Sequence, residues 1–392
     1  MHLGRTVFSQ LMDLVPRHEF RQIVRRHKGE RRVRRFSCWD QFSAMAFAQL
    51  TYRESLRDIE TCLRSLGPAL YHAGIRSRVS RSTLADANEH RSWRIYQELA
   101  LVLIAHARTL YRDDHFIDEL TNAIYALDTT IIDLCLKLFP WARANNYVKT
   151  NAGVKVHTQL DVSAKIPVFA SISTANINER QFLDELVFEP GAFYVMDRGY
   201  MDFRRLKIID RFGAFFVIRG KRDLRFDRIV SRSVDKSSGV RVDQTIRLVV
   251  PLSLEGYPDC LRRIKIFDAE HERSIVFLTN NFVLDAFTIG ELYRSRWQVE
   301  LFFKWIKQHL RIKGFYGTSP NAVYTQIWIA LSTFILVAIA KKELKLDSSL
   351  YTILQILSIT LFEKVPLHQA LSQQEHLVSG SDLANQLKLF DF

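Results

Sequence analysis

The sequence predicts an α/β protein: a mixed β-sheet with helices on both faces, a β-rich insertion in the sheet domain, and an all-α domain ahead of it. Three observations support this prediction. Helical spacing fills residues 1–114, strand-like and helical segments mix over 123–220, and four more strand-like segments lie within 221–285. A chain of 392 residues has room for two or three domains and at least one large core.

The N-terminal segment is rich in arginine. Residues 17–37, "RHEFRQIVRRHKGERRVRRFS", carry bases at nearly every helical turn, with apolar residues such as Phe20 and Ile23 between them. This mixture favours folded basic helices, and the helical pattern continues over 37–66. We therefore predict a basic helical DNA-binding domain over residues 1–78, with a solvated face on a small helical bundle as the alternative.

Residues 79–114 are predicted as connecting helices. Ser and Thr residues stand at a capping position near residue 80, and helical spacing follows as far as residue 111. The stretch 82–91, "STLADANEHR", is also compatible with a short recognition helix, although the signals of a helix–turn–helix are weak in a single sequence.

From residue 123 the pattern becomes strand-like. The order is three strands in a meander, then helix, strand, helix and strand: 123–134, 153–162, 166–175, 179–188, 192–197, 201–213 and 214–220. This is the order of a ribonuclease-H-like sheet. We predict that fold for residues 115–220 together with 286–345.

Residues 221–285 are predicted as a β-rich insertion in that domain, and residues 346–392 as a C-terminal helical tail. A helix is expected at 291–310. The uncharged run 321–340 contains Asn, Thr, Gln and Ser residues, which favours a buried core helix over a membrane span.

The charge of the chain is unusual. A formal net charge of +13 and a pI near 9.6 favour a polyanionic partner, either nucleic acid or an anionic membrane surface. With no membrane segment or signal peptide expected, nucleic acid is the preferred partner. The four cysteines are far apart, which argues against a zinc site or a disulfide framework and indicates reduced thiols in a cytosolic protein.

Three acids stand where a metal site can form. Asp128 and Asp197 lie at the ends of strand-like runs, and Glu300 lies on the helix at 291–310. Neighbouring strands present such residues at one edge of a sheet, and a helix packed across that edge can add a third acid. Three carboxylates suit Mg²⁺ or Mn²⁺ better than zinc, and two such ions can promote an in-line displacement at phosphorus.

The same helix carries bases beside its acid. At about 100° per residue, Tyr293, Arg296, Glu300 and Lys307 fall on one narrow stripe. Arginine can chelate a phosphate and lysine can act as a point charge, so the stripe suits a phosphate backbone. Each of these features alone is common in proteins. Arg296 and Glu300, for example, are also an ordinary i,i+4 pair on a helix.

The stripe has a spacing that resembles the Y-R-E-K signature of a large group of bacterial insertion-sequence transposases, the IS-four type: Tyr293-x2-Arg296-x3-Glu300-x6-Lys307. The motifs "ALDTT" around Asp128 and "DRGY" around Asp197 resemble the other two acid motifs of that group, in the same order. The resemblance covers roughly 115–345. The arginine-rich segment ahead of it resembles a domain found before this catalytic domain.

The resemblance implies a catalytic triad of Asp128, Asp197 and Glu300 that holds two Mg²⁺ ions, with Mn²⁺ able to substitute. It implies cut-and-paste movement of DNA, in which water cuts at the element end and the freed 3′-hydroxyl attacks the other strand or the target, often through a DNA hairpin. It also implies a group of DNA-binding residues: Tyr293, Arg296, Lys307, Arg198, Trp297 and Tyr200.

Three places near these motifs call for separate interpretation. Trp297 resembles a tryptophan that helps hold a flipped base, and packing in the core is the alternative. Asn178–Glu179 stands where relatives often show a His–Asp pair. We interpret His157 as a structural histidine rather than a ligand.

The predicted function is therefore a transposase that binds the terminal inverted repeats of its insertion sequence. The expected partners are double-stranded DNA, at element ends and target, and a second copy of the chain in a paired-end complex, without a membrane. The expected location is the bacterial cytoplasm, at the nucleoid. The alternatives are a catalytically inactive DNA-binding relative and a ribonuclease-H-like resolvase or nuclease.

Overall fold

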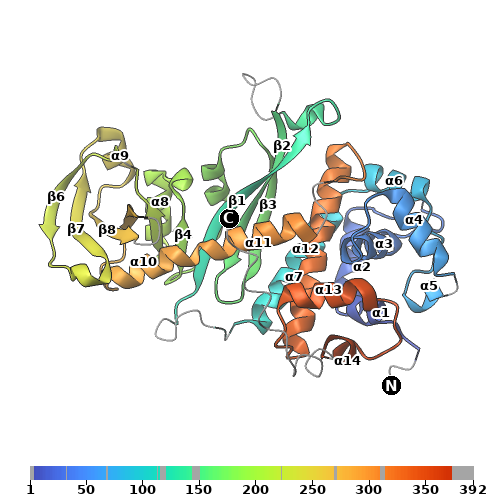
Figure 1. The fold of residues 1–392 in the computed structure, drawn as a ribbon. Coiled ribbons are helices and arrows are strands. Elements are labelled where there is room, and N and C mark those ends of the chain that lie inside the picture. The colour runs from blue at the N-terminus through green and yellow to red at the C-terminus, as the bar shows by residue number, and fades with distance from the viewer. Residues whose placement is uncertain are drawn as a thin grey trace. The chain divides into compact units, whose positions relative to one another are not determined.

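The computed structural model divides the chain into two compact units (Figure 1). Met1–Leu110 and Trp305–Phe392 form one, here called the helical unit, and Tyr111–Lys304 form the other, the sheet unit. The structure describes these residues: 4–31, 33–67, 69–112, 114, 121–143, 151–221, 223–268, 272–309 and 314–372.

The helical unit is built from both ends of the chain. Its helices are α1 (Val7–Met12), α2 (Arg17–Arg26), α3 (Cys38–Leu50), α4 (Leu56–Ser65), α5 (Ala69–His72), α6 (Arg81–His90), α7 (Arg94–Leu110), α12 (Pro320–Glu343), α13 (Leu350–Thr360) and α14 (Leu367–Ser372). A serine caps the N-terminus of five of them by accepting a backbone N–H with its hydroxyl: Ser37, Ser55, Ser80, Ser319 and Ser349. The predicted helical segments of the N-terminal region are therefore present.

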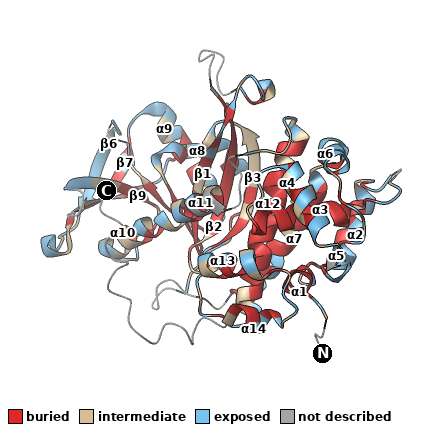
Figure 2. Ribbon diagram, turned by 45° about the vertical axis from the view of Figure 1, so that its right-hand side comes forward, coloured by how far each residue is buried: buried red, intermediate tan, exposed pale blue. Residues whose placement is uncertain are grey.

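Helix α12 is the centre of this unit. It is apolar on all sides, and such a helix needs neighbours all round it. It packs against α7, α3 and α6, and Figure 2 shows α12 largely in the colour of buried residues. By length and composition α12 could cross a membrane, but 94% of its apolar window is buried inside the structure. The prediction of a buried core helix is thus confirmed.

The grouping of α12 in the structure differs from one predicted domain range. The sequence assigned 286–345 as a whole to the sheet domain, whereas the structure groups the residues from Trp305 onward with the N-terminal helices. The reason is the all-round apolar surface of α12, which α3, α6 and α7 cover.

The described part of the sheet unit contains a nine-stranded sheet in the order β3-β2-β1-β4-β5-β9-β8-β7-β6. The bounds are β1 (Ile124–Cys135), β2 (Asn151–Asp161), β3 (Ile166–Thr174), β4 (Phe193–Met196), β5 (Phe215–Arg219), β6 (Phe226–Ser231), β7 (Val240–Leu248), β8 (Leu261–Asp268) and β9 (Arg273–Thr279). β3, β2 and β1 are antiparallel, while β1, β4 and β5 are parallel. This arrangement confirms the ribonuclease-H-like fold.

The insertion continues the same sheet. β9 pairs antiparallel with β5, and β8, β7 and β6 follow outward. The β-rich character predicted for 221–285 is therefore present, as an extension of the sheet edge.

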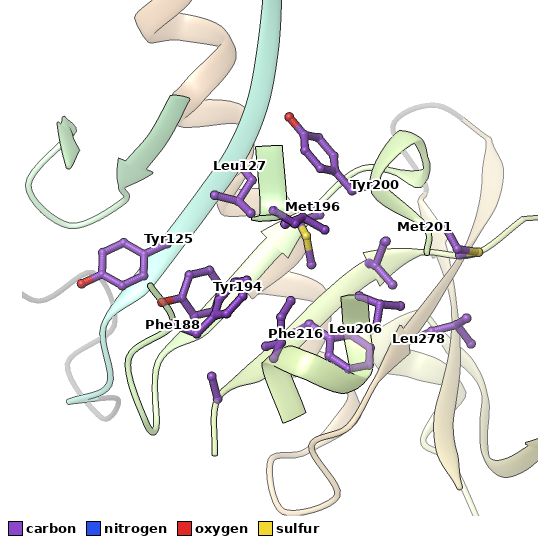
Figure 3. Packing of buried hydrophobic residues seen from close by; sticks show 14 of the residues in the cluster. Tyr125, Leu127, Phe188, Tyr194, Met196, Tyr200, Met201, Leu206, Phe216 and Leu278 are labelled. Atoms are coloured by element: carbon purple, nitrogen blue, oxygen red, sulfur yellow. The ribbon is translucent and has the colours of Figure 1, made fainter. Parts of the chain in front are cut away.

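Helices lie on both faces of the sheet. The helices are α8 (Phe203–Arg211), α9 (Pro251–Gly256), α10 (Ala286–Ser295) and α11 (Trp297–His309), with 3-10 turns η1 (Pro140–Ala142), η2 (Glu179–Glu185), η3 (Arg198–Tyr200) and η4 (Lys236–Ser238). One face carries a buried cluster that includes Tyr125, Tyr194 and Phe216 and packs against α8 (Figure 3). The other face meets α10, where Tyr293 packs on Phe277 with 4.6 Å between ring centroids.

Two predicted helices differ in detail. The helix expected at 179–188 is the 3-10 turn η2. The single helix expected at 291–310 is divided at Arg296, whose N–H bonds to the carbonyl of Tyr293, three residues back, at 3.2 Å. This tightened turn separates α10 from α11, so the predicted stripe runs across a break.

Candidate active site

Strand register brings the two aspartates together. β1 and β4 pair in parallel from Ile124 and Phe193 as far as Leu127 and Met196. Asp128 and Asp197 are the next residues on each strand, so they lie side by side where the strands diverge. The predicted strand 123–134 is present as β1, which continues past Asp128 to Cys135 because β2 pairs along it; the placement of Asp128 at the end of a strand-like run was wrong. Asp128 therefore ends the parallel pairing and not the strand.

The loop after β4 fixes Asp197. Its carboxylate caps η3 by accepting the N–H of Gly199. A Cβ at Gly199 would lie 2.8 Å from Oδ1 of Asp197 and 3.0 Å from Oε2 of Glu179. A side chain at this position would therefore displace one or both of these carboxylates. Arg198, between Asp197 and Gly199, is exposed.

Arg296 connects two of the three acids. Its Nη1 lies 3.2 Å from Oδ2 of Asp128, and its Nη2 donates to Oε1 of Glu300. The guanidinium is largely buried, and its Nε has no hydrogen-bond partner among the described residues. A buried donor without a partner is costly, so Nε is an unsatisfied donor in a group whose Nη1 and Nη2 are engaged by carboxylates.

The charged side chains of the site shift one another's pKa values. Burial raises the pKa of Asp128 to about 6; Arg296 opposes this rise, and the carboxylates of Glu300 and Asp197 add to it. Burial alone would lower the pKa of Arg296, but Asp128, Tyr293 and Glu300 hold it above its ordinary value. The three predicted acids are therefore electrostatically coupled.

A buried hydrogen-bonded chain supports β1 from its other face. Tyr200 Oη lies 2.8 Å from Oγ1 of Thr129, which lies 2.8 Å from Nδ1 of His157, and Nε2 of His157 lies 2.8 Å from Oγ of Ser173. Burial lowers the pKa of His157 to about 4, so the ring is neutral at pH 7. His157 is therefore a structural histidine, as the sequence indicated.

Tyr200 corrects one predicted site residue. The sequence assigned it to DNA contact, but its side chain is completely buried in the cluster of Figure 3 and is bonded to Thr129. It is a supporting residue, because the η3 turn directs it into the core.

Sequence reasoning assigned no role to a fourth carboxylate, Glu179. Its Oε1 lies 3.6 Å from Nζ of Lys155, a buried residue that also donates to the carbonyl of Ile177 at 2.8 Å. Its Oε2 faces Gly199 next to Asp197. The burial of Lys155 on β2 could not be predicted from the sequence, because Lys155 alternates with apolar residues as an exposed strand residue does.

The other predicted DNA-contact residues have different surroundings. Trp297 is 57% exposed, which excludes the core-packing alternative. Together with Tyr293, Arg296 and Glu300, it lines a hollow of about 880 Å³ in the sheet unit. Lys307 lies two turns after Glu300 on α11 and is half-buried, beyond the division between the units.

The donor chemistry of the site fits a hard divalent cation, since Asp128, Asp197 and Glu300 offer carboxylate oxygens in a partly buried place. Among the residues that the structure describes, no three acid, histidine or cysteine side chains are already arranged around one point as metal ligands. The guanidinium of Arg296 contacts the carboxylates of both Asp128 and Glu300.

Comparison with known proteins identifies the family. Residues 120–336, more than half of the chain, match the family described as a transposase DDE domain. The chain belongs to this family. Residues 3–76 of the transposase match a second family, described as a domain of unknown function (DUF4372).

Similar proteins agree with this assignment. A putative transposase, y4zB, of Sinorhizobium fredii is 32% identical over 285 residues, which cover 72% of this chain and 77% of that protein. A probable transposase for insertion sequence element IS5377 of Geobacillus stearothermophilus is 30% identical over 244 residues, or 61% of each chain. The predicted family, an insertion-sequence transposase, is thus confirmed, and such a protein is an enzyme that acts on DNA.

A more distant relative is a putative transposase for insertion sequence element IS4SA of Synechocystis, 22% identical over 317 residues, which cover 78% of this chain and 84% of that protein. Among solved structures, the piggyBac transposase synaptic complex with hairpin DNA is similar with a TM-score of 0.45 and 10% identity, covering 88% of this chain and 73% of that one.

Proposed function

We propose that this transposase cuts DNA at the terminal inverted repeats of its insertion sequence and joins the freed ends to target DNA. The reaction is a metal-dependent phosphoryl transfer with Asp128, Asp197 and Glu300 as the catalytic acids. The observation that carries this proposal is the contact of Arg296 with both Asp128 and Glu300, while Asp197 lies beside Asp128 where β1 and β4 diverge.

The three carboxylates would hold Mg²⁺, as two ions, with Mn²⁺ as a substitute. When bound, these ions supply activation of the attacking oxygen and stabilisation of the leaving oxygen. The chain's own contribution is to fix the ligands. Asp128 lies on a strand that is paired on both sides, Asp197 is held by the N–H of Gly199, and Glu300 lies in the first turn of α11.

The bases address the DNA backbone. The exposed Arg198 and the fork of Arg296 are suited to phosphate oxygens, and Tyr293 and Lys307 contribute a hydroxyl and a point charge. The exposed ring of Trp297 is available to stack on an unpaired base, as a route through a DNA hairpin would require.

The proposed assembly pairs two element ends between two copies of the chain, a homodimer on double-stranded DNA, with target DNA as the second substrate. The net charge of +13 supports a DNA partner, since it favours a polyanion. The proposed location is the bacterial cytoplasm, at the nucleoid.

The variant Glu300→Gln tests the catalytic role. It keeps the shape of the side chain and removes one charge from the site, so we expect wild-type binding of element-end DNA and a loss of cleavage by at least two orders of magnitude. The measurement is cleavage of a supercoiled donor plasmid in Mg²⁺, beside a gel-shift assay. Glu255→Gln, an exposed acid on α9, is the matched control. Wild-type cleavage by Glu300→Gln would contradict the assignment.

Two other outcomes would identify the alternative functions. If the wild-type protein binds element ends but shows no Mg²⁺ site by isothermal titration, it is an inactive DNA-binding relative. If it cuts branched DNA but never joins ends to a target plasmid, it is a ribonuclease-H-like resolvase or nuclease.

A further inference from the structure

We propose that a hollow in the helical unit, lined by arginines around Trp39, is a binding site for the phosphate backbone of duplex DNA. The inference rests on the proposed function, because it names where that DNA is held outside the catalytic acids. The hollow has a volume of about 700 Å³ and lies within the segment 3–76, which matches the domain of unknown function. We call it the arginine hollow and define its basic residues as Arg5, Arg17, Arg21, Arg25 and Arg76.

The centre of the arginine hollow is an arginine stacked on tryptophan. The guanidinium carbon of Arg17 lies 3.1 Å from the centroid of the Trp39 ring. Partial burial lowers the pKa of Arg17 to about 10, and the positive charges of Arg21, Arg76 and Arg5 act in the same direction, while Asp13 opposes them. Four arginines are therefore close enough to repel one another, and an anion in the hollow would relieve that repulsion.

The acids of the hollow are already engaged. Asp13 pairs with Arg5. Asp40 accepts the N–H and the hydroxyl of Ser37, at 2.9 and 2.7 Å, in the capping box of α3. Glu30 accepts the N–H of Cys38 at 3.2 Å. These three carboxylates bind nearby N–H and O–H groups and one arginine. Because five arginines line the hollow, it keeps an excess of positive charge.

Three of the arginines have side chains that are available to bind a ligand. Arg21, Arg25 and Arg76 are exposed, and the described residues offer them no ion pair or side-chain hydrogen bond. The indole Nε1 of Trp39, in the same wall, is buried and has no hydrogen-bond partner among those residues. An entering oxyanion would give the three exposed guanidinium groups partners.

The spacing of the charges favours a polymer over a small anion. Arg17, Arg21 and Arg25 follow one another at intervals of four residues on α2, so they lie along one face about 6 Å apart. A row of charges of this length matches consecutive phosphates of a nucleic acid strand, whereas a free phosphate ion would meet one or two of them.

The test measures how DNA binding depends on salt, using the full chain in EDTA so that no cleavage occurs. Each phosphate contact contributes about −0.9 to the slope of log K against log salt concentration. For Arg21→Ala/Arg76→Ala we expect a slope that is less negative by about 2, and an affinity for an element-end duplex that is on the order of tenfold lower or more near 0.15 M salt. The matched control is Arg57→Ala/Arg94→Ala, two exposed arginines of the same unit outside the hollow.

Thermal unfolding of both double variants at the wild-type temperature will show that the fold is intact. An unchanged salt slope in Arg21→Ala/Arg76→Ala would overturn the inference. So would unchanged DNA binding together with lost binding to phosphatidylserine vesicles, which would indicate a membrane surface. If the hollow variants lose affinity but the wild type never cuts DNA, the inference stands and the proposed catalysis fails. If the wild type cuts DNA but the salt slope of Arg21→Ala/Arg76→Ala does not change, the proposed catalysis stands and the inference about the arginine hollow fails.

Discussion

The side chain of Arg296 contacts Asp128 and Glu300, two of the three acids proposed as catalytic. Its single positive charge lies beside the carboxylates of Asp128 and Glu300 and offsets part of their combined negative charge. If the two carboxylates bind a divalent cation as proposed, we expect the guanidinium to compete with that cation for them.

This competition gives a prediction for Arg296→Ala. Removing the positive charge should tighten Mg²⁺ binding on the order of tenfold, as measured by isothermal titration without DNA, because the two carboxylates lose their internal counter-ion. Cleavage of donor DNA should nevertheless become slower, because a phosphate contact is lost. Arg294→Ala is the control, since Arg294 is exposed and pairs with Glu291. Equal Mg²⁺ affinity in wild type and Arg296→Ala would contradict the competition.

At the scale of elements, the active-site face of β1 depends on the hydrogen-bonded chain behind it. Thr129 follows Asp128 and points to the opposite face, where Tyr200 and His157 bind its hydroxyl. Three strands and the η3 turn are joined by these contacts. These hydrogen bonds hold the backbone of β1 in place at Asp128.

The variant Tyr200→Phe tests this supporting role. Loss of the hydroxyl should cost about 1 kcal/mol of unfolding free energy and lower the Tm by roughly 2–4 °C, while the affinity for element-end DNA stays unchanged. Differential scanning calorimetry and a gel-shift assay give the two readouts. Tyr351→Phe, at an exposed tyrosine, is the control. A weaker DNA affinity at unchanged Tm would return Tyr200 to the DNA interface.

The sequence allowed the strand order to be predicted because β-branched and aromatic runs mark each strand, and the antiparallel and parallel pairings follow from it. The break at Arg296 was not predictable. Helical spacing runs through 291–310 without a helix-breaking residue. The contact of Arg296 with Asp128 was equally hidden, because it joins residues that lie 168 positions apart in the chain. The same holds for Glu179 and Lys155, whose roles come from the loop around Gly199 and not from local spacing. The triad was predicted from motif spacing and stays a prediction, while the electrostatic coupling of its three acids needed the structure.

At the scale of the whole molecule, the helical unit is closed by the C-terminal part of the chain. The N–H groups of Val7 and Phe8 bond to the carbonyls of Glu363 and Leu361, at 2.9 and 2.8 Å. Asn321, at the start of α12, donates to the carbonyls of Asn88 and Arg91 at 2.8 and 2.7 Å. The N-terminal helices therefore lack several backbone partners without α12 and the segment that follows it.

A fragment experiment follows from this closure. Residues 1–110 alone should fail to give a cooperative thermal transition, because the surfaces of α3, α6 and α7 that α12 covers would be exposed to water. Co-expression with residues 314–372 should restore the transition, as followed by circular dichroism. A sharp transition for 1–110 alone would show that the N-terminal segment is an independent domain.

The split of the helical unit also has a consequence for synthesis on the ribosome. The segment with the arginine hollow is made first, yet α12, which completes its unit, is translated after all three acids of the site. A nascent or prematurely ended chain therefore cannot finish this unit before it has the residues for chemistry. Incomplete translation products would not compete with the full-length transposase for the ends of its element.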